Sequence, residues 1–374
     1  MKKVVLFITV LVGSLILSVN ALACTSFAVY SQKTYYGMNF DHYIHDMRFS
    51  IVNDTKSNIK VFSMDFLING KYYPTVSMSN KGLFSSCQLA YPQKGTAQKE
   101  NQDQMDMFDL FYQAPYLTDQ VKDIRKTVTD KTLICQNNFV HNLFADNNGD
   151  AVVIETDNKE KWITDIEGKS IVMTNFFNSE LKGGNIDSVT GFGADRYKKA
   201  KDYIDAHIDA FTYDDGMKAL QNAVQISGPF PTQCSMLFDP EAAEVYIVMN
   251  KDFTKAWKVS INERMVETYK GFKGHQAVEI GESGLLSEEL NNIGVYSGQT
   301  DASVTTAKSE GADTEVSDLS GSHRENSSSG NIHKENSNSI ISTKVGVTIV
   351  SCVIIILIGF AAFVIHKRKS KKSV

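Results

Sequence analysis

The chain has 374 residues, a net charge of −5 and five cysteines. The mildly acidic balance offers no strongly basic surface, so we expect no nucleic-acid partner. The cysteines are too few and too widely spaced for a disulfide scaffold.

Residues 1–23 have the pattern of a secretory signal peptide. Two lysines precede a long apolar run, and Ala21-Leu22-Ala23 supplies a small-residue cleavage site. Cleavage after Ala23 would leave Cys24 as the first residue of the exported chain, with a thiol and a free α-amine on one residue. The amine titrates at about 7.7–8.0 and a thiol near about 8.5, so the amine can act as base for the adjacent thiol. The sequence therefore predicts an N-terminal-nucleophile hydrolase for which export is also activation.

Asp41 lies just beyond the second strand of the hairpin predicted to start at Cys24. In a hairpin, the end of the second strand returns beside the start of the first. A carboxylate there can hold the α-amine by a charge-assisted hydrogen bond. The alternative is an ordinary turn aspartate.

Short strand-like runs dominate the globular part of the chain, which covers roughly 250 residues and fits one large domain as well as two. Strands, helices and then more strands predict an α+β fold in which two sheets pack between helix layers. The predicted strands are 25–31, 35–38, 50–53, 59–62, 75–79, 84–89, 139–144, 151–155, 162–165, 171–175, 234–239, 244–249 and 256–261, and the predicted helices are 118–128, 196–208 and 214–226.

The C-terminal part of the chain changes in character. Residues 281–343 are rich in Ser, Gly, Asn, Thr and Glu, which predicts a flexible, disordered stalk. Residues 344–365 predict one transmembrane helix, and the basic tail at 366–374 predicts a cytoplasmic end. A cell-wall sorting signal would need a Leu-Pro-x-Thr-Gly-like pentapeptide, and Ser337–Gly346 contains no proline. We therefore expect a single-pass protein of the cell membrane, with a catalytic domain at 24–280 outside the cell.

The other cysteines and the histidines give no metal-binding pattern. We interpret Cys87, Cys135 and Cys234 as small buried apolar residues, with a disulfide as the alternative. His42 and His45 would lie on opposite faces of a strand, and only a helical turn would bring them together. We expect no metal and no cofactor.

A family resemblance strengthens this interpretation. Cys24-Thr25-Ser26-Phe27, followed by Tyr36-Gly37-Met38-Asn39-Phe40-Asp41, resembles the choloylglycine hydrolase family of linear amide C–N hydrolases. That family includes bile-salt hydrolases, penicillin V acylases, and N-acylethanolamine and ceramide amidases. Further stretches match the family in order, namely Ser79–Leu83, Phe144–Glu155, Thr174–Asn178 and Asp195–Tyr197. The resemblance covers roughly Cys24 to Ile261 and implies a four-layer αββα N-terminal-nucleophile fold.

The resemblance also implies roles for five residues. Cys24 would be the nucleophile, with its α-amine as base, and Asp41 would orient that amine. Asn175 and Asn178 would offer amide N–H groups to the oxyanion and the substrate carbonyl. Arg196 would support the nucleophile or its aspartate. Without the family match, the asparagines would be interpreted as turn residues and the arginine as a solvated charge.

Two positions depart from the family pattern. Bile-salt hydrolases and penicillin V acylases carry an arginine where this chain has Met38, so the field at the nucleophile is expected to be less positive. Bile-salt hydrolases also carry an asparagine before Tyr-Pro where this chain has Ala90. Both differences argue against a bile-salt hydrolase proper and fit a divergent branch, with an inactive relative as the alternative.

Three functions remain open from the sequence. The leading hypothesis is an amidase that hydrolyses a small-molecule acyl amide through an acyl-thioester on Cys24. An acyltransferase would use the same thioester with an amine as acceptor. A lipidated surface binding protein would carry lipid on Cys24, but such signals usually place Leu three residues before the Cys, where this chain has Ala21.

Overall fold

The computed structural model describes residues 23–43, 46–54, 57–93, 103–181, 186–189 and 191–295. The predicted signal peptide (apart from Ala23), the predicted transmembrane helix and the predicted basic tail therefore lie outside the described residues. None of the described helices combines the length and the apolar character needed to cross a bilayer.

Two eight-stranded antiparallel sheets form the centre of the molecule. The first has the strand order β12-β1-β2-β13-β14-β15-β16-β17, and the second has the order β11-β10-β9-β6-β5-β4-β3-β18. The strands of the first sheet are β1 (Ala23–Tyr30), β2 (Thr34–Asp41), β12 (Ser170–Met173), β13 (Thr232–Asp239), β14 (Glu244–Met249), β15 (Ala256–Ser260), β16 (Met265–Lys270) and β17 (Ala277–Glu279). Those of the second are β3 (Met47–Asp54), β4 (Ile59–Ile68), β5 (Lys71–Ser79), β6 (Phe84–Leu89), β9 (Val140–Ala145), β10 (Ala151–Thr156), β11 (Lys161–Asp165) and β18 (Leu285–Leu286).

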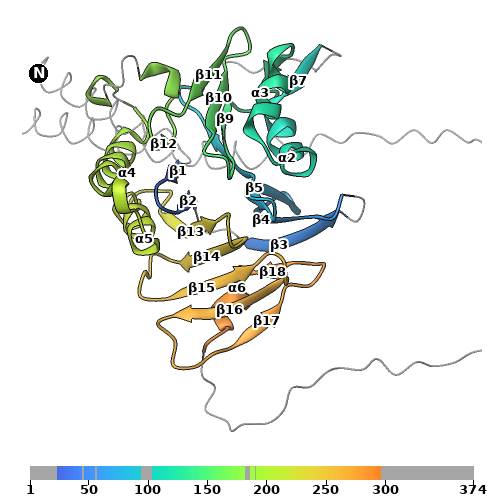
Figure 1. Ribbon diagram of the computed structural model, residues 1–374, viewed down its shortest axis with the longest axis vertical. Coiled ribbons are helices and arrows are strands. Elements are labelled where there is room, and N and C mark those ends of the chain that lie inside the picture. Colours follow the sequence, from blue (N-terminus) through green and yellow to red (C-terminus); the bar gives the residue numbers. More distant parts are fainter. Residues whose placement is uncertain are drawn as a thin grey trace, which may run out of the picture. The chain divides into compact units, whose positions relative to one another are not determined.

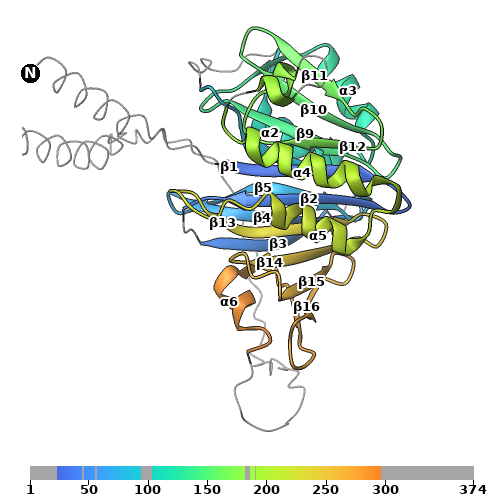
Figure 2. The same ribbon diagram turned by 90° about the vertical axis from the view of Figure 1, so that its left-hand side faces the viewer.

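Helices cover the outer face of each sheet. Helices α4 (Ala194–His207) and α5 (Tyr213–Asn222) pack on the first sheet, as Figure 2 shows, and α2 (Met107–Leu117) packs on the second. Helix α3 (Val121–Thr129) and the short parallel pair β7 (Gln104–Asp106) and β8 (Thr132–Ile134) lie beside α2 (Figure 1). Separate buried clusters fill the spaces between α4, α5 and the first sheet, between the two sheets, and between the second sheet and α2 and α3. The layer order is therefore helix, sheet, sheet, helix.

Strand β1 shows how this sandwich places the candidate nucleophile. Phe27 and Val29 belong to the core beneath α4 and α5, whereas Cys24 and Ala28 belong to the core between the sheets. Successive side chains of a strand alternate between its two faces, so both faces of β1 are covered and its residues read as a continuous buried run. The register of the strand thus directs the Cys24 side chain into the space between the sheets.

Gly37 on β2 is required by close packing rather than by backbone freedom. It lies opposite Phe27 on β1, and a Cβ atom at this position would fall 2.2 Å from the Phe27 ring. The absence of a side chain lets the ring lie across β2, which keeps the hairpin that carries Cys24 and Asp41 tightly packed against the helix layer.

Each predicted strand overlaps an observed strand, and each predicted helix overlaps α3, α4 or α5. Helix α2, which contains Pro115, was not predicted, and neither were β16 and β17. The predicted start of the stalk at Gly281 is too early. Strand β18 pairs with β3, and the short helix α6 (Ser287–Asn292) follows, with Leu290 and Ile293 buried in the core between the sheets. A few apolar residues in a polar stretch anchor this segment.

Candidate active site

Cys24 lies at the start of β1, opposite Phe40 of β2. Its side chain is 7 % exposed and lines the largest cavity described below. Its backbone nitrogen donates a hydrogen bond to the Asn175 Oδ1 atom at 2.8 Å. In the uncleaved chain this nitrogen is an amide, whereas in a chain that begins at Cys24 the same atom would be the α-amine.

Asp41 is the last residue of β2, and it pairs with Ala23, the residue before the candidate nucleophile. Its carboxylate is fully buried, and Oδ1 accepts a hydrogen bond from the Thr232 hydroxyl at 2.5 Å. The Oδ2 atom lies 3.2 Å from Nη1 of Arg196 but accepts no well-aligned hydrogen bond from any described residue. The hairpin therefore places a carboxylate with spare acceptor capacity next to the Ala23–Cys24 bond.

Arg196 connects the other groups of the site from the first turn of α4. Its Nη1 atom donates to the Cys24 carbonyl at 2.5 Å and to the Thr25 hydroxyl at 2.9 Å, and its Nη2 atom donates to the Asn175 Oδ1 atom at 2.8 Å. The guanidinium reaches these partners because Gly193 precedes the helix with φ of 86°. A Cβ there would lie 2.8 Å from Nη2 of Arg196.

Asn175 follows β12 and holds the backbone of Cys24 with its carbonyl oxygen. One N–H of its side-chain amide donates to the Leu89 carbonyl at 2.8 Å, which ties β12 to the end of β6. An amide group carries two N–H donors, and the hydrogen bond to Leu89 uses one of them. Asn175 is fully buried. Four of the five predicted site residues lie together, because Arg196 contacts each of the other three, Cys24, Asp41 and Asn175.

Asn178 has a different set of partners. It begins the 3-10 turn η1 (Asn178–Glu180), where its backbone N–H donates to Glu155 at 2.6 Å and its side-chain amide donates to the Val172 carbonyl at 2.9 Å. Among the described residues, no hydrogen bond or ion pair joins Asn178 to the other four. Glu155 also accepts a hydrogen bond from the buried His141, so Asn178 belongs to a polar cluster that fixes the turn after Asn175. Its predicted role at the oxyanion stays a prediction.

Burial controls the protonation states at this site. It raises the pKa of the Cys24 thiol to about 12, and the Asp41 charge adds to the rise, while the Asp41 backbone N–H and Arg196 oppose it. Burial also raises the pKa of Asp41 to about 7, against the lowering effects of Arg196, Thr232 and Lys251. At neutral pH the thiol of the uncleaved chain is therefore protonated, and it needs a base to become a nucleophile.

A cavity of about 1130 Å³ opens beside Cys24. One wall is aromatic, with ring centroids of neighbouring side chains 4.3–6.1 Å apart. The rings belong to Phe40, His42, Tyr43, Phe66 and Phe230. The lining also includes polar residues, among them Asp106, Asp109 and the segment Gln136–Asn138. Ligand pockets commonly have a mostly apolar lining with a few polar groups, which describes this cavity.

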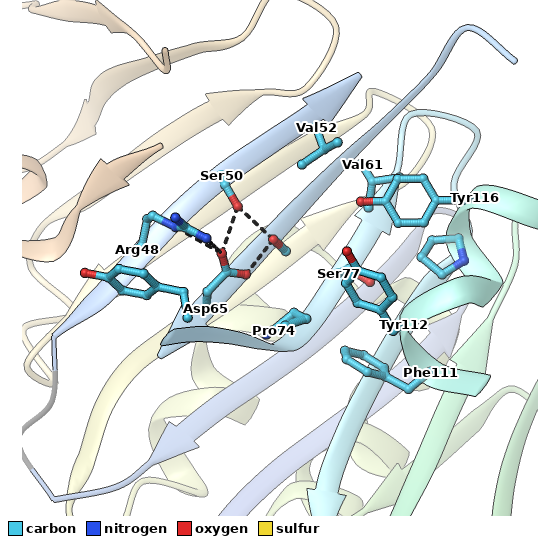
Figure 3. Close-up of a pocket in the computed structure, with 13 residues that line it drawn as sticks. Arg48, Ser50, Val52, Val61, Asp65, Pro74, Ser77, Phe111, Tyr112 and Tyr116 are labelled. Carbon is cyan, nitrogen blue, oxygen red and sulfur yellow. Dashed lines mark hydrogen bonds and ion pairs between the residues drawn. The ribbon is translucent and has the colours of Figure 1, made fainter. Parts of the chain in front are cut away.

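A second hollow of about 120 Å³ lies on the outer face of the second sheet, between β3, β4, β5 and α2 (Figure 3). Its carboxylate, Asp65, already accepts hydrogen bonds from Arg48, Ser50 and Ser63. The hollow contains no thiol, and its charged groups neutralise one another, so it is a weaker candidate for chemistry than the cavity beside Cys24.

The four cysteines in the described part of the chain, 24, 87, 135 and 234, are buried and unpaired, as the interpretation of the last three as apolar core residues expects. No described group of His, Cys, Asp or Glu could hold a metal ion. His42 stacks on Phe40 in the aromatic wall, whereas His45 lies outside the described residues.

The two residues that depart from the family pattern are both buried. Met38 packs between the sheets, where its sulfur accepts a hydrogen bond from Ser86 at 3.7 Å. Ala90 packs in the core beneath α2 and α3. The surroundings of the nucleophile therefore have a neutral thioether at position 38, and Arg196 is the arginine that contacts Cys24.

Sequence reasoning missed two polar residues of the site. Thr232 bonds Asp41, and Gln88 lines the cavity while its amide donates to the Ser26 hydroxyl at 2.5 Å. Neither lies in a motif. Thr232 is a single hydroxyl at the start of a strand, and Gln88 is one polar residue in a buried strand, so only the packing of distant strands reveals them.

Replacing Arg196 with methionine is expected to lower the free energy of unfolding by about 3–5 kcal/mol, because it leaves the buried Asp41 without its cation. The loss should be larger at pH 8 than at pH 6, since Asp41, with a pKa of about 7, can neutralise itself at the lower pH. Urea unfolding at both pH values measures it. Arg125→Met is the matched control, because Arg125 is 27 % exposed in its ion pairs with Asp150 and Asp165 and should cost about 1 kcal/mol or less. Equal losses in the two variants would contradict this description.

Comparison with solved structures identifies the fold. Two variants of conjugated bile acid hydrolase from Clostridium perfringens match with TM-scores of 0.53 and 0.54 at 14 % and 12 % identity, covering 66 % and 69 % of this chain and 97 % of each of theirs. Penicillin V acylase from Agrobacterium tumefaciens matches with a TM-score of 0.49 at 12 % identity, over 66 % of this chain and 91 % of its own. No family model and no curated protein matches the sequence. The chain therefore shares the mixed α/β sandwich fold of conjugated bile acid hydrolase.

Proposed function

We propose that this protein is an amidase of the choloylglycine hydrolase family that cleaves a linear, non-peptide C–N amide bond with Cys24 as an N-terminal nucleophile. The observation that carries the proposal is the contact set around Cys24. Its nitrogen bonds Asn175, its carbonyl bonds Arg196, and the carboxylate of Asp41 lies at the end of the paired strand. The fold shared with an amide hydrolase supports the same conclusion.

The α-amine of the cleaved chain would be the general base. The amine would replace the amide N–H that now donates to the Asn175 Oδ1 atom. A protonated amine has further N–H donors for the Oδ2 atom of Asp41, which pairs with Arg196 but accepts no well-aligned hydrogen bond from the described residues. A charge-assisted bond to the carboxylate would fix the amine beside its own thiol. Because burial raises the thiol pKa to about 12, the thiol needs a nearby base to remove its proton before it can attack a substrate.

The proposed reaction has two stages. The α-amine takes the thiol proton, the sulfur attacks the amide carbonyl carbon, and the ammonium returns the proton to the departing amine as the C–N bond breaks. This leaves an acyl-thioester on Cys24 and a free amine. Water then loses a proton to the α-amine and attacks the thioester, which releases the acid and restores the thiol. The second N–H of Asn175 is the proposed donor to the oxyanion.

The cavity supports an apolar acyl group as the recognised part of the substrate. Phe40, whose ring belongs to the aromatic wall, is the cross-strand partner of Cys24, so the wall begins beside the sulfur. Burial of an aliphatic or aromatic acyl group against such a wall provides binding energy in proportion to the apolar area removed from water. We propose N-acyl amides with an aliphatic or aromatic acyl group as substrates.

The test of this proposal uses a chain that begins at Cys24 and a panel of N-acyl amides of increasing acyl length. Release of the amine, together with an acid-quenched protein whose N-terminal peptide gains the acyl mass, is the expected result. Free acid as product indicates hydrolysis, and transfer of the acyl group to an added amine would instead indicate an acyltransferase. Absence of both amine release and acyl mass across the panel would contradict the proposal.

Asp41→Asn is expected to lower kcat/KM by about 10²-fold, because the variant keeps the shape of the side chain but loses the charge that orients the α-amine. A carboxylate beside an amine favours the ammonium form and raises its pKa. Its removal should therefore move the acid limb of the pH–rate profile to lower pH. The profile of kcat/KM from pH 5 to 9 measures both effects, and a variant with the parent's profile would rule out this role for Asp41.

We also propose that the catalytic domain is exported and held at the outer face of the cell membrane. The proposal rests on the signal-like residues 1–23 and the apolar segment 344–365. Proteolysis of intact cells should remove the domain from the cell surface, whereas protection in intact cells and digestion only after lysis would contradict this location.

A further inference from the structure

We propose that Thr232 is a positioning residue that holds Asp41 in its ionised, correctly oriented form. The inference deepens the proposed function, on which its catalytic meaning rests. Thr232 opens β13 directly opposite Asp41, and the register of the two strands shifts at this point. The side chain is fully buried, and its hydroxyl lies 2.5 Å from the Asp41 Oδ1 atom.

The direction of this hydrogen bond follows from the donors that each partner has. The Gln225 backbone N–H donates to the Thr232 hydroxyl oxygen at 2.9 Å, so that oxygen already acts as an acceptor. A hydroxyl has one hydrogen, and the carboxylate of Asp41 has none when it is ionised. Thr232 therefore gives its only hydrogen to Asp41. Such a bond favours the carboxylate over the neutral acid and is among the stronger hydrogen bonds in proteins.

Thr232 also fixes the backbone on which this contact depends. Its N–H donates to the Gln225 carbonyl at 3.0 Å, and its own carbonyl accepts a hydrogen bond from Lys251 at 2.9 Å. The adjacent Pro231 carbonyl accepts from the backbone N–H of His42, the residue after Asp41. The segment that leads into β13 is thus bonded to the end of β2 on both sides of the carboxylate.

The charged groups around Asp41 act on its ionisation in both directions. Arg196 from α4 and Lys251 after β14 favour the carboxylate, while Asp195 from α4 and burial oppose it. The Cys24 thiol faces it from β1, and His42 packs away from it into the aromatic wall. Arg196 contacts Oδ2 without good hydrogen-bond alignment, so the Thr232 hydroxyl is the well-aligned donor that the structure describes for this carboxylate.

Thr232→Val tests the inference because valine has nearly the same shape but no hydroxyl. In the chain that begins at Cys24, we expect the pKa of Asp41 to rise by about one unit, since a hydrogen bond to a charged group contributes about that much to its ionisation. At pH values below the Asp41 pKa, kcat/KM of the variant should be about tenfold lower than that of the parent. At alkaline pH the two values should approach each other. KM should not change, because Thr232 does not line the cavity.

A readout independent of catalysis separates this inference from the proposed function. In protein labelled with ¹³C at aspartate carboxyl carbons, the signal absent from Asp41→Asn identifies Asp41, and its titration should move to higher pH in Thr232→Val. Thr232→Ser should restore the parent titration, and Thr232→Ala replaces Thr232→Val if the latter does not fold. Thr156→Val, which removes a buried hydroxyl that bonds the Leu133 and Glu160 carbonyls, is the matched control and should leave Asp41 unchanged.

Each outcome of these measurements decides the inference. A parent-like Asp41 titration in folded Thr232→Val, or an equal change in Thr156→Val, would overturn it. A shifted titration reversed by serine would support it, even if the parent protein hydrolysed no amide, in which case only the proposed function would fail.

Discussion

Replacement of Cys24 by alanine is expected to abolish amide cleavage, with a fall in kcat/KM of at least about 10³-fold. The sulfur is the atom that would carry the acyl group, and alanine offers nothing in its place. The fold should survive, because the side chain is small and lies at the start of β1, where it borders the cavity. Steady-state release of amine from an N-acyl amide measures the loss.

A matched control distinguishes loss of the nucleophile from loss of a buried thiol. Cys234 is also fully buried, on β13, but it does not line the cavity. Cys234→Ala should retain amide cleavage and the mass gain of the N-terminal peptide. If Cys24→Ala cleaves the amide as fast as Cys234→Ala, the nucleophile is a different residue.

A chain that begins at Ala23 is expected to be at least about 10³-fold less active than one that begins at Cys24. With Ala23 in place, the Cys24 nitrogen is an amide that cannot accept a proton, and it already donates to the Asn175 Oδ1 atom. The thiol pKa of about 12 leaves only about one thiol in 10⁵ ionised at pH 7. The extended chain thus has neither a base nor a useful amount of thiolate.

Restoration by cleavage makes this experiment decisive. Removal of the added alanine by an aminopeptidase should return the extended chain to the activity of the chain that begins at Cys24. Full activity before cleavage would exclude the α-amine from the mechanism, while leaving Cys24 itself open to test by the alanine variant.

The hairpin that begins at Cys24 was predictable because its signals are local. Continuous runs of buried side chains mark β1 and β2, and a tight turn between them brings Asp41 back to the start of the hairpin, where it pairs with Ala23. The predicted arrangement of two sheets between helix layers is likewise present, since short apolar runs and amphipathic helices mark each layer.

Contacts between distant segments could not be derived from local patterns. Arg196 reaches the Cys24 carbonyl across 172 positions of sequence, and Thr232 reaches Asp41 across 191. The family resemblance pointed to Arg196, but no motif pointed to Thr232. The same resemblance grouped Asn178 with Asn175, although the turn between them directs Asn178 toward Glu155. Such contacts depend on how distant strands and helices pack together, and local patterns in one sequence do not predict that packing.

The mass of the N-terminal peptide of the protein purified from cells that make the whole chain tests the central claim most directly. The proposed mechanism requires that peptide to begin at Cys24 with an unmodified amine and thiol. That result would establish the pair of groups that the site around Asp41, Asn175 and Arg196 is arranged to hold. A peptide that retains residues before Cys24 would contradict the α-amine mechanism. A Cys24 sulfur that carries a diacylglyceryl group would contradict the hydrolase and favour a surface binding protein.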